Sequence, residues 1–352
     1  MQLLTVYKAP YLLNSSGVFQ SDPWMVFSGR SLVELGFGSP PSQLGKPISL
    51  DGVVFPGLVN SYCRLGEHSP LEQKEQWWDL QKEHQELDLK QLQGAVNEAR
   101  SSGTFFLNHF SSNIAVSRAI HGIDGFRGVR FYDRPDMVSS QEQVANDLRD
   151  DHEIIPALHS LRLTTEEDLD HFLKIRRKNT HVVYLGGNEP AYDHDINKGQ
   201  LGYLQRKGFY EARRVMLVEP EPLSAVRLTD FGRDVPLPGV ILLPGMASFM
   251  QYSRRDIQSI IESQVYSLLG SGSLAVGQSA DMLKQVSLLR DLDVAEEKEV
   301  WKMATANAYD MMELRPEKIS FFVSLGSGPS FDEVLSSKQL RRLDTYELLK
   351  AG

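Results

Sequence analysis

The chain has a single cysteine, Cys63, among its 352 residues. One thiol cannot form a disulfide within the chain, so a disulfide-stapled fold is excluded and a reducing, cytoplasmic location is expected. Basic residues are in the minority, since 37 Lys and Arg are outnumbered by 46 Asp and Glu and the formal net charge is -9. Nonspecific nucleic-acid binding depends on clustered Lys and Arg, so no nucleic-acid partner is expected.

Long hydrophobic runs are absent as well. The start, Met1–Lys8, has no basic segment followed by a long apolar stretch, which is the pattern of a secretory signal. No stretch approaches the length needed to cross a membrane, so no membrane partner is expected. The residues that are present, 41% hydrophobic and 24% charged, suffice for the core of one enzyme-sized unit.

The order of apolar segments predicts an α/β fold. Short strands separated by Gly, Ser and Pro are expected over residues 3–13, 24–27 and 32–35. From Val53 onward, short runs rich in Val, Ile and Leu alternate with amphipathic stretches, as in parallel β/α units. These runs are Val53–Asn60, Thr104–Asn108, Gly128–Tyr132, Ile154–Leu158, Val182–Leu185, Val215–Val218, Val240–Leu243 and Leu274–Gly277. Eight parallel strands are the number that closes a (β/α)8 TIM barrel, which is therefore the predicted fold.

Helices and the domain division follow from the same pattern. Helices are expected over 71–100, 164–178 and 256–269, and a last one over 295–312. A β-rich run at 319–325 follows, and we expect it to return to the N-terminal strands. The prediction is a small β-sandwich domain from residues 1–55 and 318–352, and a barrel over residues 56–317.

The segment Gly52–Leu65 reads GVVFPGLVNSYCRL. It resembles the first barrel strand of the amidohydrolase superfamily, V-x-P-G-L-V-N-x-H-x-H-L, in the branch of cytosine deaminases, chlorohydrolases and aminofutalosine deaminases. Weaker similarities follow in the family's order at Leu65–Leu71, Pro156–Thr165 and Met303–Ala308. The resemblance covers nearly the whole chain and implies the fold of a metal-dependent hydrolase, an amidohydrolase-like barrel flanked by a β-sandwich.

The metal ligands of that family are replaced in this chain. The two histidines of the first strand hold a catalytic divalent metal, and their places are taken here by Tyr62 and Arg64. The resemblance puts the other ligand positions, on the fifth, sixth and eighth strands, at Tyr184 and Gly187, Glu219, and Ser279. A guanidinium stays protonated and has no lone pair to give, so it cannot ligate a metal. Because a hydrolase of this family needs a metal to lower the pKa of bound water, we predict no metal, no cofactor and no metal-dependent hydrolysis.

A metal site rebuilt from other residues is a separate hypothesis. His109 and His159 follow the second and fourth predicted strands, and Glu219 follows the sixth. Two histidines and a glutamate form a known zinc set. The positive charge of Arg64 would lie close to the cation and oppose it, so this hypothesis is disfavoured.

The replacements favour a polar pocket with a fixed cation at the carboxyl ends of the strands, where barrel active sites lie. Arg64 is expected to clamp a carboxylate or a phosphate there. The other members of this predicted ligand-binding set are Tyr62, His109, His159, Tyr184, Glu219 and Ser279. The structural alternative is that Arg64 pairs with Glu219 and fills the volume left by the metal. Cys63 is expected to point away from the pocket as a small core residue.

Three functions remain open. The favoured one is a pseudoenzyme with a degenerate metal site that binds a small metabolite or supports an active homologue, as a homodimer or a hetero-oligomer. The second is a metal-independent enzyme that uses acid-base chemistry, with Glu219, His159 and Tyr184 as catalytic candidates. The third is a conventional C–N hydrolase or deaminase with relocated ligands. Loss of catalytic groups requires no new chemistry, which favours the first.

Overall fold

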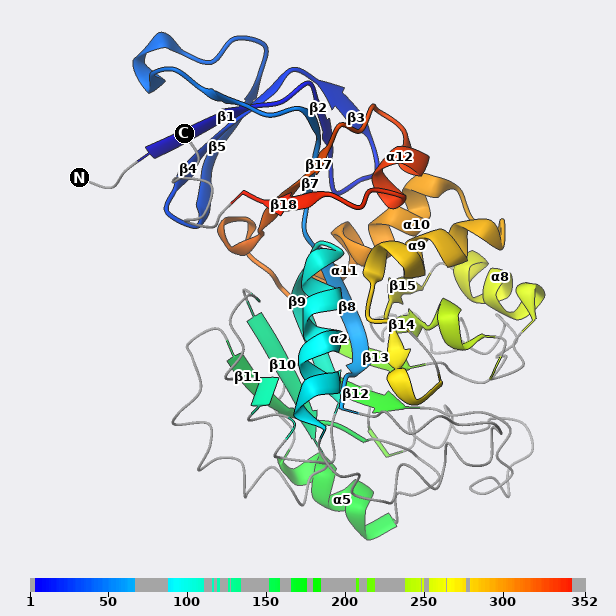
Figure 1. The fold of residues 1–352 in the computed structure, drawn as a ribbon. Helices are drawn as coiled ribbons and strands as arrows, with labels where there is room; N and C mark the ends of the chain where they lie inside the picture. Colours follow the sequence, from blue (N-terminus) through cyan, green and yellow to red (C-terminus); the bar gives the residue numbers. More distant parts are fainter. Residues whose placement is uncertain are drawn as a thin grey trace.

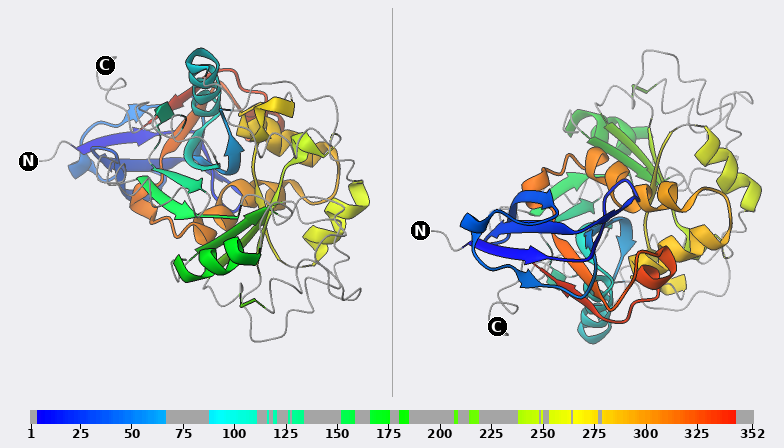
Figure 2. Two further views of the ribbon diagram at one scale, coloured as in Figure 1. Left: turned by 90° about the horizontal axis from the view of Figure 1, so that it is seen from below. Right: turned by 90° about the horizontal axis from the view of Figure 1, so that it is seen from above.

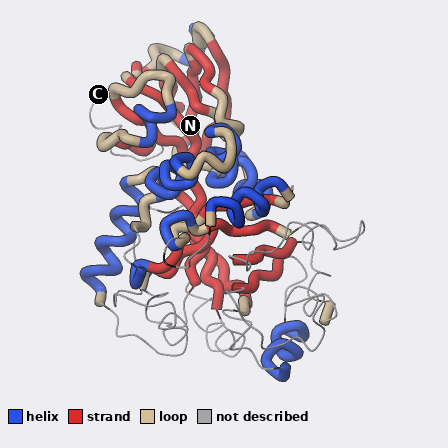
Figure 3. The backbone as a smooth tube through the Cα atoms, turned by 90° about the vertical axis from the view of Figure 1, so that its right-hand side faces the viewer, coloured by secondary structure: helices blue, strands red, loops and turns tan. Residues whose placement is uncertain are grey.

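The computed structural model describes the chain in ranges separated by gaps. These ranges are 4–66, 88–110, 116, 119–120, 126, 128–133, 152–158, 166–175, 180–184, 207–208, 214–218, 238–247, 249, 253–263, 265–276 and 279–343. For the strands in 128–133, 152–156 and 180–184, the backbone alone is described. Two groups of strands fill this part of the chain, one near both termini and one beneath it with helices around it (Figure 1, Figure 3).

The group near the termini consists of two sheets. Its strands are β1 (Leu4–Lys8), β2 (Tyr11–Leu13), β3 (Phe19–Ser21), β4 (Pro23–Ser28), β5 (Ser31–Phe37), β6 (Ile48–Ser49), β7 (Gly52–Pro56), β17 (Phe321–Leu325) and β18 (Leu340–Arg342). One sheet has the order β5-β4-β1-β6 and the other β18-β17-β7-β2-β3. Tyr7, Met25 and Phe27 of the first sheet belong to one apolar cluster with Val54 and Val323 of the second.

The two ends of the chain meet in the second of these sheets. β17 pairs antiparallel with β7, and the red C-terminal strands lie beside the blue N-terminal ones (Figure 2). This confirms the prediction that the C-terminal β-rich run returns to the N-terminal strands. The domain boundaries at residues 55 and 318 stay a prediction.

Parallel strands make up the second group. They are β8 (Leu58–Arg64), β9 (Thr104–Phe110), β10 (Gly128–Asp133), β11 (His152–Pro156), β12 (Thr180–Tyr184), β13 (Arg214–Val218), β14 (Gly239–Leu242), β15 (Tyr266–Leu269) and the short β16 (Gly272–Ser273). They form two sheets, β11-β10-β9-β8-β16 and β12-β13-β14-β15, and between the described residues no hydrogen-bonded pairing joins these sheets into a closed barrel. Every side chain of β8, β9 and β14 is buried, as expected for parallel strands covered on both faces.

The first predicted run, Val53–Asn60, is two strands in two different sheets. Gly57 joins β7 to β8, and a Cβ there would lie 2.7 Å from the ring of Phe105, so the close approach requires glycine. The N–H of Gly57 donates to the carbonyl of Ser320 at 2.7 Å, and its own carbonyl accepts from the hydroxyl of Tyr309. The chain therefore passes from the sandwich sheet into the first parallel strand at a single glycine.

The prediction of the eighth parallel strand is wrong. Leu274–Val276 forms a 3-10 turn, η4, and the eighth strand is β15, which pairs in parallel with β14. The helix predicted over residues 256–269 was too long, since α8 (Arg254–Glu262) ends at Glu262. The last residues of that predicted helix form β15. A four-residue apolar run before Gly270 fits either a helix end or a buried strand, and the pairing with β14 decides between them.

The predicted helices lie at their expected places in the chain, but the observed helices are shorter than predicted. Besides α8, the described helices are α2 (Leu89–Ser101), α5 (Glu166–Ile175), α9 (Met282–Asp291), α10 (Glu297–Ala304), α11 (Ala306–Met311) and α12 (Phe331–Leu335). Besides η4, the described 3-10 turns are η1 (Ser42–Leu44), η3 (Pro244–Met246) and η5 (Pro316–Lys318). Residues 71–87 of the first predicted helix lie outside the described ranges. The last predicted helix is two, because Thr305 has φ -128° and ψ -99°. None of the described helices is long and apolar enough to cross a membrane.

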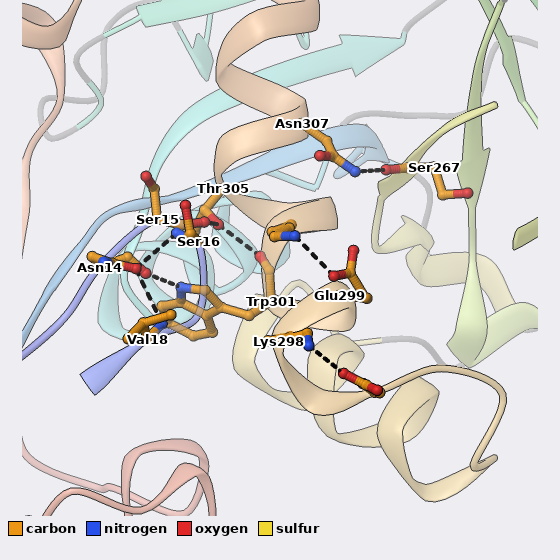
Figure 4. A network of polar contacts seen from close by, with 12 residues as sticks. Asn14, Ser15, Ser16, Val18, Ser267, Lys298, Glu299, Trp301, Thr305 and Asn307 are labelled. Atoms are coloured by element: carbon orange, nitrogen blue, oxygen red, sulfur yellow. Dashed lines mark hydrogen bonds and ion pairs between the residues drawn. The ribbon is translucent and has the colours of Figure 1, made fainter. Parts of the chain in front are cut away.

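The pair α10–α11 connects the two groups of strands (Figure 4). Trp301 Nε1 donates to the carbonyl of Asn14 at 2.9 Å, and Thr305 Oγ1 donates to the carbonyl of Ser15 at 2.8 Å. On the other side, Asn307 Nδ2 donates to the carbonyl of Ser267 in β15 at 3.0 Å. These bonds attach both the β2–β3 turn and β15, the eighth parallel strand, to the helix pair α10–α11.

Candidate functional site

The carboxyl end of β8 carries Tyr62 and Arg64, and a β-bulge lies at Tyr62. The register between β8 and β9 shifts between Asn60 and Cys63, and such bulges re-aim side chains next to functional sites. Within the shift, Tyr62 lies in the main apolar cluster, whereas Cys63 at its end lies in a second cluster with residues of α2. Cys63 is fully buried and burial raises the pKa of its thiol, which confirms that it is a core residue.

Tyr62 occupies its position as a packed aromatic ring. It is 1% exposed, and its ring centroid lies 4.5 Å from that of Phe110 at the end of β9. Leu243 and Met246, which follow β14, belong to the same apolar cluster. The place that the resemblance gives to a metal-binding histidine is therefore lined by apolar side chains.

Arg64 and His109 lie together at the ends of β8 and β9, and they are 3% and 1% exposed. The backbone N–H of Leu65 donates to His109 Nε2 at 3.2 Å, so the imidazole is neutral and its proton is on Nδ1. Burial first, and the charge of Arg64 second, lower the pKa of His109 to about 3. His109 therefore carries no charge at neutral pH, and the guanidinium of Arg64 is the cation of this pair.

The segment after the true eighth strand, Gly270–Ser273, lies beside β8. Ser273 pairs with Arg64, and the Asn60 side chain bonds Ser271 twice, donating to its Oγ at 2.8 Å and accepting from its N–H at 3.0 Å. Because β15 ends at Leu269, the residues that follow the eighth parallel strand are Gly270, Ser271 and Gly272. Gly272 has φ +75°, and a Cβ there would overlap the sulfur of Met246.

Ser279 does not lie at the end of a parallel strand, because Leu274–Val276 before it forms a 3-10 turn, and its assignment to the aspartate position stays a prediction. Its hydroxyl donates to the carboxylate of Glu98 on α2, and the same carboxylate accepts from the N–H of Ala280 at 3.0 Å. Asp281 follows as the N-cap of α9, where it accepts from the N–H of Lys284 at 2.9 Å. Ser279 thus belongs to a junction between α2 and α9, because the strand that was expected to carry it is a 3-10 turn.

The remaining predicted positions divide into two kinds. Tyr184 ends β12, where its backbone pairs with that of Val218. His159, Gly187 and Glu219 lie outside the described residues. The described part of the site brings together Tyr62, Arg64 and His109.

The described residues do not fit a catalytic divalent metal. Within the described ranges, no group of three or more His, Cys, Asp or Glu side chains is placed to hold a metal ion. At the two first-strand positions given by the resemblance stand a phenol and a guanidinium, and Gly272, which follows β15, has no side chain. Zinc requires histidine, cysteine or carboxylate ligands at close range, and none of these three positions supplies one.

Two features of the site were missed from the sequence. Gly270–Ser273 was not assigned to the site, and its glycines after an apolar run were the signal for the end of a strand. Met246 gave no signal, because its contact with Gly272 joins residues from two different strand ends. Only the pairing of β14 with β15 brings them together.

Comparison with known proteins gives similarity in fold and not in sequence. No family model matches the chain, and no curated protein matches it by sequence. Among solved structures, Helicobacter pylori aminofutalosine deaminase in complex with methylthio-coformycin matches with a TM-score of 0.74 and 13% identity, over 96% of this chain and 97% of that one.

Two further structures show the same fold. An adenosine deaminase from Xanthomonas campestris with bound zinc has a TM-score of 0.71 and 14% identity, over 96% of this chain and 90% of that one. Guanine deaminase from C. acetobutylicum with bound guanine has a TM-score of 0.65 and 11% identity, over 91% and 90%. These three neighbours are deaminases with the TIM-barrel fold of the amidohydrolase superfamily, and the mixed α/β fold of this chain is similar to theirs.

Proposed function

We propose that this protein is a pseudoenzyme of the amidohydrolase fold, which holds no hydrolytic metal and binds a small anionic metabolite through Arg64. The observation that carries the proposal is the guanidinium of Arg64, 3% exposed, at the end of the first parallel strand. In the resembled family this position belongs to a metal-binding histidine. A fixed cation there repels a metal ion and attracts a carboxylate or a phosphate.

The eighth strand supports the absence of hydrolysis. The family's aspartate both binds the metal and handles protons, and we assign its place to Gly272, which follows β15. Because Met246 fills the space next to Gly272, this end of the strand has neither the carboxylate nor the room for one. A proton shuttle would have to come from another residue.

His109 does not supply that shuttle. Its Nε2 accepts the N–H of Leu65, and its low pKa, caused by burial and by Arg64, keeps it neutral. It can neither give up a proton near pH 7 nor take one without losing the bond to Leu65. The acid-base alternative therefore depends on Glu219, His159 and Tyr184.

Metal content is the first test of the proposal. Protein purified without chelators and analysed by mass spectrometry of the elements is expected to contain no stoichiometric zinc, iron or manganese. The reason is the ligand set, since Arg64 and Tyr62 replace the first-strand histidines. About one equivalent of metal, lost in Glu219→Ala, would show a rebuilt site and overturn the proposal.

Ligand binding is the second test. The solved neighbours carry names of adenosine, guanine and aminofutalosine deaminases, so matched probes are adenosine and adenosine 5′-monophosphate, together with small dicarboxylates. Thermal shift and calorimetry are expected to detect an anionic probe and not its neutral counterpart. Replacing a charge-assisted, two-pronged contact should weaken binding about 10- to 100-fold in Arg64→Gln and less in Arg64→Lys.

The structural alternative predicts a different result. If Arg64 only pairs with Glu219, no anionic probe stabilises the protein, and Arg64→Gln lowers stability without changing any binding. Equal binding of a probe to wild type and to both Arg64 variants would likewise contradict the assigned role of the guanidinium.

A further inference from the structure

Strand β8 has one residue more than β9 near its carboxyl end. Asn60 pairs with Leu107, and the next registered pair is Cys63 with His109. Three steps along β8 therefore match two steps along β9, which is the count of a β-bulge. The two residues between Asn60 and Cys63 stand opposite the single residue Asn108.

The bulge determines which face of the sheet each later residue of β8 occupies. Cys63 packs with Leu107 and residues of α2, and α2 lies against this face (Figure 1). Tyr62 packs against Phe110 in the main apolar cluster, on the opposite, inner face. Because side chains alternate along a strand, Arg64 follows Tyr62 to the inner face.

Regular pairing without the bulge would reverse these faces. Asn60 pairs with Leu107 and thus lies on the α2 face. Regular alternation from there brings Tyr62 and Arg64 to the α2 face as well, and Cys63 to the inner face. The orientation of the guanidinium, on which the proposed anion site depends, is therefore set by one extra residue.

The side chain of Asn108 is bonded at this bulge. Its Nδ2 donates to the carbonyl of Ser61 at 3.2 Å and to Met312 Sδ at 3.1 Å. Its backbone carbonyl accepts from the thiol of Cys63 at 3.5 Å. The reversed amide would place an oxygen against the Ser61 carbonyl, so the nitrogen belongs on this side. Asn108 is thus bonded to the residues on both sides of Tyr62.

Packing alone does not account for an asparagine at this position. Phe106 and Phe110, its neighbours on the same face of β9, belong to the main apolar cluster. Asn108 is fully buried, and among the described residues its Oδ1 has no hydrogen-bond partner. A buried amide with an unpaired oxygen is less stabilising than an apolar side chain of similar volume. The residue is better explained by a role in specifying one strand register.

We propose that Asn108 is a positioning residue for the anion site at Arg64, because its amide caps the Ser61 carbonyl in the bulge and so keeps the guanidinium on the inner face. The inference rests on the proposed function for its ligand. The hold of Asn108 on the strand can be measured without a ligand.

Asn108→Leu tests the proposal, since it keeps the approximate volume and removes the donor. Cys63 is fully buried and burial raises the pKa of its thiol, so a maleimide is expected to label the folded wild type slowly. In Asn108→Leu the labelling rate is expected to rise at least about tenfold. The affinity for adenosine 5′-monophosphate, measured by calorimetry, is expected to fall at least about tenfold.

Deletion of Ser61 provides a rescue that a merely structural role would not give. It removes the extra residue, so regular alternation brings Tyr62 and Arg64 to the inner face without a bulge. In this background, Asn108→Leu is expected to change the labelling of Cys63 and the probe affinity by less than about twofold.

Thr104→Val is the matched control. Thr104 is 1% exposed at the start of the same strand, away from the bulge, and this change also replaces a buried polar side chain by an apolar one of similar volume. Its labelling rate and affinity are expected to stay within about twofold of wild type. Urea unfolding of each variant shows how much of the labelling passes through global unfolding.

Three outcomes would overturn the inference. One is a folded Asn108→Leu in which Cys63 stays as protected as in wild type. Another is an equal rise in labelling with and without Ser61, which would assign Asn108 to general packing. The third is a loss of folding in Asn108→Leu that the deletion does not reverse, whereas recovery of the fold supports the proposal. If no anionic probe binds the wild type, the proposed anion binding fails, and faster labelling in Asn108→Leu still supports the role of Asn108 at the bulge.

Discussion

Gly52→Ala is expected to prevent folding, or to lower the free energy of unfolding by at least about 4 kcal/mol, from one added methyl group. Gly52 has φ +133°, and a Cβ there would overlap the backbone carbonyl oxygen of Ser324 in the paired strand β17. Because the obstacle is backbone and not a flexible side chain, no rotamer change relieves it. Soluble yield and urea unfolding measure the effect.

Gly326→Ala is the control for this prediction. Gly326 also has a positive φ, +71°, but a Cβ there would meet nothing within 4 Å. Gly326→Ala introduces the backbone strain without the overlap, and it is expected to lower the free energy of unfolding by about 1 kcal/mol. Equal losses in the two variants would mean that φ alone matters, and would contradict the tight β7–β17 contact. Since β7 leads directly into β8, a shifted β7 would also displace Arg64.

His109 is expected to make stability depend on pH in acid. Its pKa is about 3 in the folded protein and about 6.5 in the unfolded chain, because burial and Arg64 oppose its charge. Between these values the unfolded chain binds more protons than the folded protein, so stability is present above pH 6.5 and is lost as the pH falls toward 3. The loss reaches on the order of 4 kcal/mol at full effect.

Comparing wild type with His109→Gln isolates this contribution. The glutamine side chain keeps an oxygen that can accept the N–H of Leu65, and it does not titrate. Urea unfolding at a series of pH values should show the two curves converging or crossing as the pH falls, with wild type losing stability faster. Parallel curves for the two proteins would show that His109 takes up its proton in the folded state as easily as in the unfolded one.

The places of Arg64 and His109 in the fold could be predicted from the sequence, but their contacts could not. Their positions at the ends of the first and second parallel strands follow from the apolar runs that precede them, and both predictions of place agree with β8 and β9. The bond from Leu65 to His109 does not follow from any spacing. It depends on the bulge in β8, which changes how the two strands face each other.

The eighth strand shows where local sequence stops being sufficient. Tyr266–Leu269 was expected to be the end of a helix, because its apolar residues continue the pattern of α8. It is a strand because β14 offers a hydrogen-bonding edge at that point, and the bonds to that edge outweigh the local preference. Because of this error, Ser279 was expected at the end of a strand, although it lies at the junction between α2 and α9.

The sequence by itself determined the α/β class, the order of nearly all parallel strands and the return of the C-terminal run to β7. These are consequences of composition and periodicity, which act over a few residues at a time. Only the tertiary structure decided which run is the eighth strand and that Met246 closes the space at Gly272. Each of these depends on contacts between residues distant in the chain, which burial and strand pairing select and local pattern does not encode.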